Sequence, residues 1–262
     1  MKIISACHLI VDPPAGGAWN MAVDEALLHE VTESELPVLR FYEWERPTLS
    51  LGRFQRVEDR NQYLASLSAD LVRRQSGGGA ILHDREVTYS LMLPGKHPLS
   101  HDSQTLYDAV HQCLFEFLTS QIAPAADSWQ LALCEPPSEV RKRDEPFFCF
   151  ERRSRGDILL CEKTAASNYK IVGSAQRRSR GAVLQHGSIL LEQSPAAPEI
   201  SGIADLTGVS ISPARFTATV SSQLSQSLGL DLQQFQIGQQ LTLEAEFLRK
   251  TKFGSPRWTQ RR

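Results

Sequence analysis

The first stretch with a regular pattern of apolar residues predicts a helix. Between residues 19 and 28, apolar side chains recur at the spacing of one helix face. Asn20 is a residue type that caps helix N-termini well, and Asp24 and Glu25 follow near the positive end of the helix dipole. We therefore expect a helix over residues 19–28 with Asn20 as its cap.

The pattern then changes to short β-rich runs. Residues 38–44 and 48–51 are predicted strands separated by a proline, and residues 70–73 form a third strand that leads into a run of glycines. Residues 87–93 form a further β-rich run that stops at a Pro-Gly pair. After its first helix, this half of the chain is therefore expected to be dominated by strands.

A second helical pattern covers residues 103–119, where apolar residues recur at helical intervals behind Ser103, the expected cap. Such a helix buries one face, so it predicts a helix layer packed on the sheet. Three more strands are predicted at residues 157–160, 169–172 and 183–191. The short turns between them favour antiparallel neighbours.

The pattern becomes helical again in the last quarter of the chain. Further helices are predicted at residues 203–206, 217–228 and 241–248. A tail rich in Lys and Arg follows, either as a solvated end or as a docking patch for an acidic partner. No break in composition marks a second domain. We expect one domain over residues 1–262, with a core at about 1–210 and a helical C-terminal subregion at about 211–262.

The composition limits the classes of protein to which the chain can belong. Its 262 residues are 41% hydrophobic and 22% charged, which is ordinary for a globular protein. A formal net charge of -2 argues against a dedicated nucleic-acid binder, which usually needs a basic surface. No stretch has the roughly 18 to 20 apolar residues that span a bilayer, and the N-terminus lacks the apolar core of a signal peptide. We expect a cytoplasmic protein that binds neither nucleic acid nor membranes.

The cysteines argue against a metal or disulfide framework. There are 5 of them, with no C-x-x-C pair, and the odd number leaves at least one unpaired. Structural zinc and disulfides are therefore not expected, and we expect no metal site. A free cysteine most often acts as a small buried hydrophobe, so a reactive one must be argued from its surroundings.

A triplet of glycines at residues 77–79 stands in a run that begins with two arginines. Its spacing fits neither the dinucleotide-binding pattern nor the P-loop pattern. A tight hairpin also uses glycine, but a two-residue turn does not need three of them. Arg73 and His83 lie nearby, and glycine lets backbone approach a ligand closely. The run is therefore as consistent with a loop that binds an anion or an acyl amide as with a plain turn. The residues alone leave both interpretations open.

A second motif, K-I-V-G-S-A-Q, begins at Lys170 at the end of a β-rich stretch. The ammonium would emerge where Gly173 again lets backbone approach a ligand closely. Most lysines are solvated surface residues, so this motif alone does not define a site. Together with the glycine triplet and the helix at residues 20–27, it resembles the lipoate-protein ligase and octanoyltransferase superfamily, and the resemblance covers about residues 1–210.

The resemblance implies a role for each motif. Lys170 matches the family lysine that contacts the acyl carbonyl, and Cys149 matches the Cys-Phe pair that supplies the acyl-accepting thiolate in cofactor-independent octanoyltransferases. Arginines follow Cys149, and nearby cations favour a thiolate. Cys161 is the rival nucleophile because it lies closer to the lysine in sequence. The implied substrate-binding residues are Arg73, Ser76, Gly77, Gly78, Gly79, His83, Gly173, Ser174, Ala175, Gln176 and His186.

The fold implied by the resemblance is the α/β (α+β) catalytic domain of biotin and lipoate protein ligases. That fold has a mixed, largely antiparallel sheet flanked by helices, which agrees with the pattern derived above. A parallel nucleotide-binding sheet would need strands and helices in regular alternation, and residues 38–93 lack it.

The implied activity is that of an octanoyltransferase that requires no cofactor. Cys149 would accept an octanoyl (or lipoyl) group from octanoyl-acyl carrier protein, and a lysine of a lipoyl-domain or glycine-cleavage H-type protein would then take it. Three alternatives stay open: a lipoate-protein ligase that uses ATP and Mg and forms lipoyl-AMP, an amidotransferase between proteins, and a non-catalytic acyl-protein binder. Six arginines are expected to steer the acidic carrier: Arg152, Arg153, Arg155, Arg177, Arg178 and Arg180.

Overall fold

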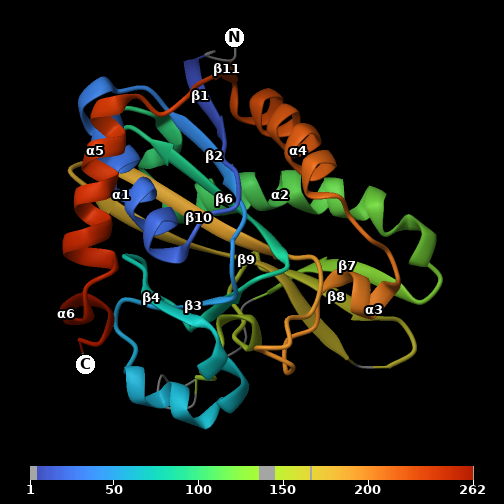
Figure 1. Cartoon of the computed structure of the whole chain (residues 1–262). Coiled ribbons are helices and arrows are strands. Elements are labelled where there is room, and N and C mark those ends of the chain that lie inside the picture. Colours follow the sequence, from blue (N-terminus) through green and yellow to red (C-terminus); the bar gives the residue numbers. More distant parts are fainter. Residues whose placement is uncertain (1–4, 136–144, 166, 262) are drawn as a thin grey trace.

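A computed structural model describes residues 5–135, 145–165 and 167–261, and its main feature is one large sheet. The strands of this sheet are β1 (Ser5–Val11), β2 (Val38–Tyr42), β6 (Glu86–Leu93), β7 (Trp129–Leu133), β8 (Ile158–Glu162), β9 (Asn168–Ser179), β10 (Ala182–Leu190) and β11 (Leu230–Gln234). Their order is β11-β1-β2-β6-β10-β9-β8-β7 (Figure 1). β1 pairs in parallel with β2 and β11, and the other neighbours are antiparallel. The expected mixed, largely antiparallel sheet is confirmed.

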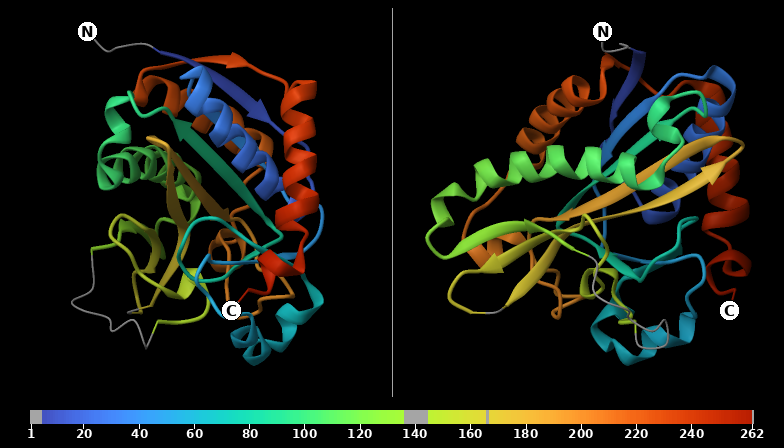
Figure 2. Two further views of the ribbon diagram at one scale, coloured as in Figure 1. Left: turned by 90° about the vertical axis from the view of Figure 1, so that its left-hand side faces the viewer. Right: turned by 180° about the vertical axis from the view of Figure 1, so that it is seen from behind.

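Helices cover both faces of this sheet. They are α1 (Gly17–Ser34), α2 (Ser103–Gln121), α3 (Ile203–Thr207), α4 (Pro213–Leu228), α5 (Gln239–Leu248) and α6 (Pro256–Thr259). α2 and α4 lie on one face and α1 and α5 on the other, as the views from the side and from behind show (Figure 2). None of the helices in the described part of the chain has the length and apolar character that crossing a membrane requires.

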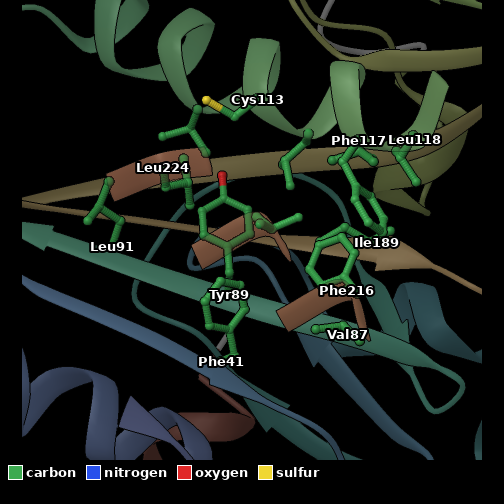
Figure 3. Packing of buried hydrophobic residues seen from close by; sticks show 14 of the residues in the cluster. Phe41, Val87, Tyr89, Leu91, Cys113, Phe117, Leu118, Ile189, Phe216 and Leu224 are labelled. Carbon is green, nitrogen blue, oxygen red and sulfur yellow. The ribbon is translucent and has the colours of Figure 1, made fainter. Parts of the chain in front are cut away.

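The α2 face of the sheet is closed by a buried apolar core (Figure 3). Phe216 of α4 packs edge-on against Phe41 of β2 and Phe117 of α2. Full burial of a side chain of this kind contributes about 1.5–3 kcal/mol relative to leaving it exposed. The core therefore fixes α2 on the sheet, and α2 carries Tyr107 and His111 to the back of β9.

A second, small sheet lies beside one end of the large one. It consists of β4 (Asp70–Arg73), β3 (Thr48–Leu51) and β5 (Ile81–His83), in that order. Short helical turns connect these and other elements: η1 (Val57–Gln62), η2 (Leu64–Ser68), η3 (Pro98–Ser100), η4 (Ala123–Ala125), η6 (Cys149–Glu151) and η7 (Arg249–Phe253). The glycine triplet lies in the connection from β4 to β5, and Ser76 directly before it forms a hydrogen bond with His186 of β10 in the large sheet.

The predicted helices and strands are all present, the strands at 48–51 and 70–73 with the predicted bounds and the others with shifted bounds, but both predicted caps are wrong. α1 begins three residues before Asn20, whose Nδ2 instead donates to the carbonyls of Ala15 and Glu43 at 3.2 and 3.1 Å. α2 is capped by Asp102, which accepts a hydrogen bond from Thr105 N at 2.7 Å. The side chain of Asn20 therefore forms hydrogen bonds with other segments and does not cap the helix.

The acidic residues of α1 are also not at its positive end. Asp24 is buried in the middle of the helix, where its Oδ1 accepts from Arg40 Nη1 at 2.7 Å. Burial alone would raise the pKa of Asp24, but the Arg40 charge and His186 outweigh burial and hold it below its usual value. Asp24 therefore ties α1 to the sheet by a buried ion pair rather than by the helix dipole.

Candidate functional site

Cys149 lies beside the glycine triplet because three phenylalanines anchor its segment. Phe147 and Phe148 pack into the core of the small sheet, and Phe150 packs into a separate apolar cluster. Main-chain bonds fix the segment further: Ala80 N donates to Phe147 O at 2.8 Å, and Cys149 N donates to Ala80 O at 2.7 Å. The aromatic rings are thus buried while the thiol stays half-buried.

The ammonium of Lys170 reaches the same point from β9. Its Nζ lies 4.0 Å from Cys149 Sγ and donates to the Cys149 carbonyl at 3.4 Å. Gly173 makes room for it, since a Cβ at Gly173 would lie 2.3 Å from Lys170 Cε and 2.7 Å from Nζ. The structure therefore brings together the two residues that the sequence singled out, and the glycine of the motif is needed by the lysine itself.

Asp157, which the sequence did not reveal, holds Lys170 from behind. Its Oδ2 lies 2.8 Å from Lys170 Nζ and accepts from Ser154 N at 2.7 Å, while Oδ1 accepts from Tyr107 OH at 2.6 Å. The Lys170 and Asp157 side chains are only 2% and 1% exposed. Charge-assisted bonds of this kind fix one geometry. The one sequence signal was an aspartate at the first position of the strand predicted at residues 157–160, which was expected to lie antiparallel to that of the lysine.

A hydrogen-bonded network connects this pair to α2. Ser174 N donates to Tyr107 OH at 3.2 Å. His111 Nδ1 lies 2.8 Å from the carbonyl oxygen of Gly156, so Nδ1 carries the proton and Nε2 accepts from Ser174 Oγ at 2.7 Å. Burial lowers the pKa of His111 to about 3, which keeps the ring neutral and preserves this direction of donation. Ser174 of the lysine motif therefore serves as a strut to α2.

The glycine triplet wraps the guanidinium of Arg74. Arg74 Nη2 donates to the carbonyls of Gly77 and Gly79 at 2.8 and 2.5 Å. Burial lowers the pKa of Arg74 to about 10, and no carboxylate of the described residues pairs with it. A Cβ on Gly78, whose φ is +92, would lie 3.1 Å from Arg74 Nη2 and 3.8 Å from Cys149 Sγ. An unpaired cation close to a thiol is the surrounding in which thiolates are favoured.

Arg73, by contrast, points away from the thiol. Its guanidinium donates to the carbonyls of Gly52 and Gln55 at 2.9 and 2.7 Å, and to that of Thr259 at 3.0 Å. These bonds fasten the C-terminal α6 to the small sheet. The sequence-based choice of Arg73 as a substrate-binding residue thus falls on a structural arginine, and Arg74 holds the position beside the thiol.

Both predicted histidines are held by buried partners. His83 Nδ1 donates to Glu86 Oε1 at 2.6 Å, and burial lowers the pKa of His83 although Glu86 opposes the shift. His186 Nε2 lies 2.5 Å from Ser76 Oγ, and its Nδ1 lies 3.7 Å from Asp24 Oδ2. Ser76 therefore reaches the site through His186, whose ring is oriented by α1.

A narrow, largely apolar slot has Cys149 in its lining. Its open volume is about 20 Å³, room for about one water molecule, so an alkyl chain enters only where the lining side chains move apart. Six of the residues expected at the site line it: Cys149, His83, Gly173, Ser174, Ala175 and His186. Gln176 turns away, since its Nε2 donates to the Ser103 carbonyl at 2.7 Å on the α2 face.

The other candidate groups lie elsewhere. Cys161 sits on β8 outside the slot lining, and burial raises the pKa of its thiol, so it ionises less readily than an exposed cysteine. In residues 5–135, 145–165 and 167–261, no group of three or more His, Cys, Asp or Glu side chains is arranged to hold a metal ion.

Four of the six arginines expected to steer a carrier have different surroundings. Arg152 pairs with Glu145, and Arg153 Nη2 donates to the carbonyl of Asn168 at 3.1 Å. Arg178 Nη2 donates to Ser103 Oγ at 3.1 Å on the α2 face, so Arg177, the preceding residue of β9, faces the opposite side. Only Arg177 therefore shares a face with the slot residues of β9.

Comparison with known proteins gives one consistent answer. A family model described as the lipoyl protein ligase A/B catalytic domain matches residues 17–236. The octanoyltransferase LipM of Macrococcus caseolyticus (strain JCSC5402) is 32% identical over 277 residues, 93% of this chain and 94% of the relative. That of Bacillus anthracis is 31% identical over 270 residues, 94% of each chain.

The solved structures agree on the fold. One of them describes an archaeal lipoylation system, a bi-partite lipoate protein ligase and its E2 lipoyl domain from Thermoplasma acidophilum. It contains a chain that superposes with a TM-score of 0.68 at 21% identity, covering 98% of this chain and 96% of that chain. At this identity the likeness concerns the arrangement of helices and strands alone.

Proposed function

The chain belongs to the lipoyl protein ligase A/B catalytic domain family, and from this premise we propose that it is an octanoyltransferase of protein lipoylation that works through a thioester on Cys149. The observation that carries the proposal is the 4.0 Å separation of Lys170 Nζ from Cys149 Sγ, together with the place of Cys149 in the lining of the apolar slot. Acyl transfer requires a nucleophile, a cation that stabilises the carbonyl oxygen of the acyl group, and a site for the alkyl chain.

In the first step, the Cys149 thiolate attacks the carbonyl carbon of an octanoyl thioester on a carrier protein. A bond forms from Sγ to this carbon, the bond to the pantetheine sulfur breaks, and the released thiolate takes up a proton. Lys170, fixed by Asp157, stabilises the negative oxygen that develops on the carbonyl. Loss of one such preorganised donor typically lowers the rate by roughly 100- to 1000-fold.

In the second step, the neutral amine of an acceptor lysine attacks the Cys149 thioester. The new bond is an amide, the bond to Sγ breaks, and the proton lost by nitrogen passes to the sulfur or to solvent. Exchange between two thioesters is nearly isoenergetic, and aminolysis of a thioester is downhill, so the reaction needs neither ATP nor a metal. The acceptor is a lipoyl-domain or glycine-cleavage H-type protein, in line with the lipoyl domain that accompanies the archaeal ligase.

The slot also supports a preference for medium chains. Its lining includes Met21, Tyr42, Ile81 and Ala175, which offer mostly apolar surface to an alkyl group. Each methylene that leaves water contributes about 0.8 kcal/mol, so the slot discriminates between chains by the number of methylenes that it buries once its lining side chains move apart.

Transfer can be measured with octanoyl-carrier protein and a lipoyl domain in a buffer without nucleotide or added metal. The proposal predicts that the mass of the lipoyl domain rises by a single octanoyl group, and that Cys149→Ser abolishes the gain. A gain that requires ATP and free acid would indicate a ligase. A gain only from an already acylated protein donor would indicate an amidotransferase, and acyl binding without any transfer would indicate a non-catalytic binder.

A further inference from the structure

Three arginines from distant parts of the chain lie close enough for their charges to repel one another. Arg53 follows β3, and its backbone N donates to Ser76 O at 2.9 Å, which places it on the loop of the glycine triplet. Arg177 lies two residues after Ala175 on β9, so it extends from the face of β9 that lines the slot. Arg261 comes from the end of the chain. We call Arg53, Arg177 and Arg261 the arginine cluster.

The C-terminal segment brings Arg261 to this place through Trp258. Trp258 Nε1 donates to Arg73 O at 2.8 Å, which fixes the indole against β4. Arg261 Cζ lies 4.2 Å and Arg53 Cζ 5.8 Å from the centroid of the indole ring. A tryptophan face attracts cations, so the indole holds these two guanidinium groups near each other. The end of the basic tail is therefore fixed on the small sheet.

No carboxylate in the described part of the chain forms an ion pair with the arginine cluster. Glu25, whose charge acts on Arg53, is itself bound by Lys252 at 2.5 and 2.8 Å. The pKa of Arg53 is lowered by burial and then by repulsion from Arg177 and Arg261. Three cations held together without a counter-ion repel one another, which costs stability unless a ligand supplies negative charge.

Two atoms of the cluster also lack a hydrogen-bond partner. The Nε atoms of Arg177 and Arg261 are buried and find no acceptor among the described residues. A buried donor left unpaired loses its hydrogen bonds to water without replacement, which lowers stability. The cluster thus needs both negative charge and acceptor oxygens, and a phosphate supplies both. Guanidinium groups match phosphate oxygens with two parallel hydrogen bonds each.

We propose that the arginine cluster binds the phosphate of the pantetheine arm that delivers the acyl group. This inference rests on the proposed function, because it takes the donor to be a carrier-bound thioester. In such a donor the phosphate is separated from the thioester by two amide units, so an acyl group in the slot leaves the arm running outward along the slot rim. The acceptor lysine carries no phosphate. The cluster therefore acts on the acylation step and not on the transfer step.

Two small donors test the proposal: octanoyl-4′-phosphopantetheine and octanoyl-pantetheine, which differ only in the phosphate. The rate of acylation is followed by intact mass at low donor concentration. Hydrogen bonds to charged groups contribute about 1.5–3 kcal/mol each, so wild-type protein is expected to favour the phosphorylated donor by about tenfold or more. Arg53→Met, Arg177→Met and Arg261→Met should each lower this preference at least about threefold, and salt should weaken it.

Matched variants keep the test sharp. Arg177→Lys retains a positive charge and should keep part of the preference, while Arg257→Met removes an exposed charge of α6 outside the cluster and should keep all of it. The preference is a ratio within one protein sample, so a partly misfolded variant does not distort it. Transfer from preformed acyl-enzyme to the lipoyl domain should be unchanged in all cluster variants.

The outcomes separate this inference from the proposed function. Equal acylation of wild-type protein by both donors, or a preference that survives in all three methionine variants, overturns the phosphate site while leaving the Cys149 thioester in place. Acylation by neither donor nor by octanoyl-carrier protein contradicts the proposed function and the phosphate site together.

Discussion

The ammonium of Lys170 forms a 2.8 Å ion pair with the carboxylate of Asp157, and both side chains are almost completely buried. A buried pair of this kind adds little net stability, because desolvation offsets most of the attraction, but it is costly to break. The role of this pair is to fix the position of the Lys170 ammonium. Asp157 leaves the ammonium facing Cys149, where it is needed for the carbonyl of the acyl group.

Asp157→Asn should lower the rate of acyl-enzyme formation by roughly 10- to 1000-fold. Both oxygens of Asp157 accept hydrogen bonds, from Lys170, Ser154 and Tyr107, so either orientation of an asparagine amide turns an NH₂ group towards a donor. Breaking the pair should also lower the free energy of unfolding by about 3–5 kcal/mol. Urea unfolding and acylation kinetics measure the two effects.

The control for this variant is Glu246→Gln, which breaks the half-exposed pair with Arg249. Exposed pairs contribute about 0–1 kcal/mol, so this change should leave unfolding and acylation close to wild type. An Asp157→Asn protein that acylates at the wild-type rate would show that the ammonium does not depend on Asp157 for its position.

Gly173→Ala should reduce acylation more strongly than it reduces stability. The new Cβ would lie 2.3 Å from Lys170 Cε, so the flexible lysine side chain must move away from Cys149 Sγ. Gly238→Ala is the control, because its Cβ would meet nothing within 4 Å. Acylation kinetics and thermal unfolding of both variants check this, and equal loss of activity in the two would contradict the steric argument.

The stability of the fold should depend on pH through His111. Burial lowers the pKa of His111 to about 3 in the folded protein, while an unfolded histidine titrates near about 6.5. Between these values the unfolded chain binds a proton that the folded chain does not, so stability falls on acidification below about pH 6.5. This residue alone should contribute up to about 1.4 kcal/mol per pH unit.

Urea unfolding at about pH 6.5 and about pH 5 measures this slope. His111→Gln removes the titrating ring and should flatten the decline, although it also lowers stability at both pH values. His101→Gln changes an exposed histidine and should keep the wild-type slope. An identical slope in wild type and His111→Gln would contradict the assignment of a buried neutral ring.

The two neighbouring arginines should separate stability from activity. Arg73→Gln removes a guanidinium that binds the carbonyls of Gly52, Gln55 and Thr259, so it should lower the free energy of unfolding by about 2–4 kcal/mol. Arg74→Gln should instead slow acylation by octanoyl-carrier protein more than tenfold, because it removes the unpaired cation near Cys149. Urea unfolding and acylation kinetics of both variants check these expectations. A lower acylation rate in Arg73→Gln than in Arg74→Gln would contradict them.

Much of the fold could be predicted because its signals are local. The periodicity at residues 103–119 reflects one buried face of α2, and the β-rich run at 87–93 is the fully buried β6. Cys149 and Lys170 could be named because their motifs resemble those of a family. Of the missed strands, β5, β7 and β11 lie at sheet edges, where the preference of residue types for strands depends strongly on context, whereas β1 is an internal strand whose pattern was overlooked.

The remaining features of the site depend on tertiary contacts that cannot be read from the sequence. Arg73 and Arg74 are adjacent, so their side chains point to opposite sides of the chain. Arg73 contacts the C-terminal segment and Arg74 lies near the thiol. The sequence alone does not say which of the two faces the thiol, because this depends on how the small sheet packs. Asp157 meets Lys170 through the pairing of β8 with β9, where Leu159 lies opposite Lys170. Asn20 does not cap α1, because its side chain donates to the carbonyl of Glu43 in a loop 23 residues away.

The most direct test of the central claim is the intact mass of the protein after brief incubation with octanoyl-carrier protein alone. The account predicts a gain of a single octanoyl group that is absent in Cys149→Ser and retained in Cys161→Ser. A gain that persists in Cys149→Ser, or protein that stays free of adduct and instead consumes ATP with free lipoate, would contradict it.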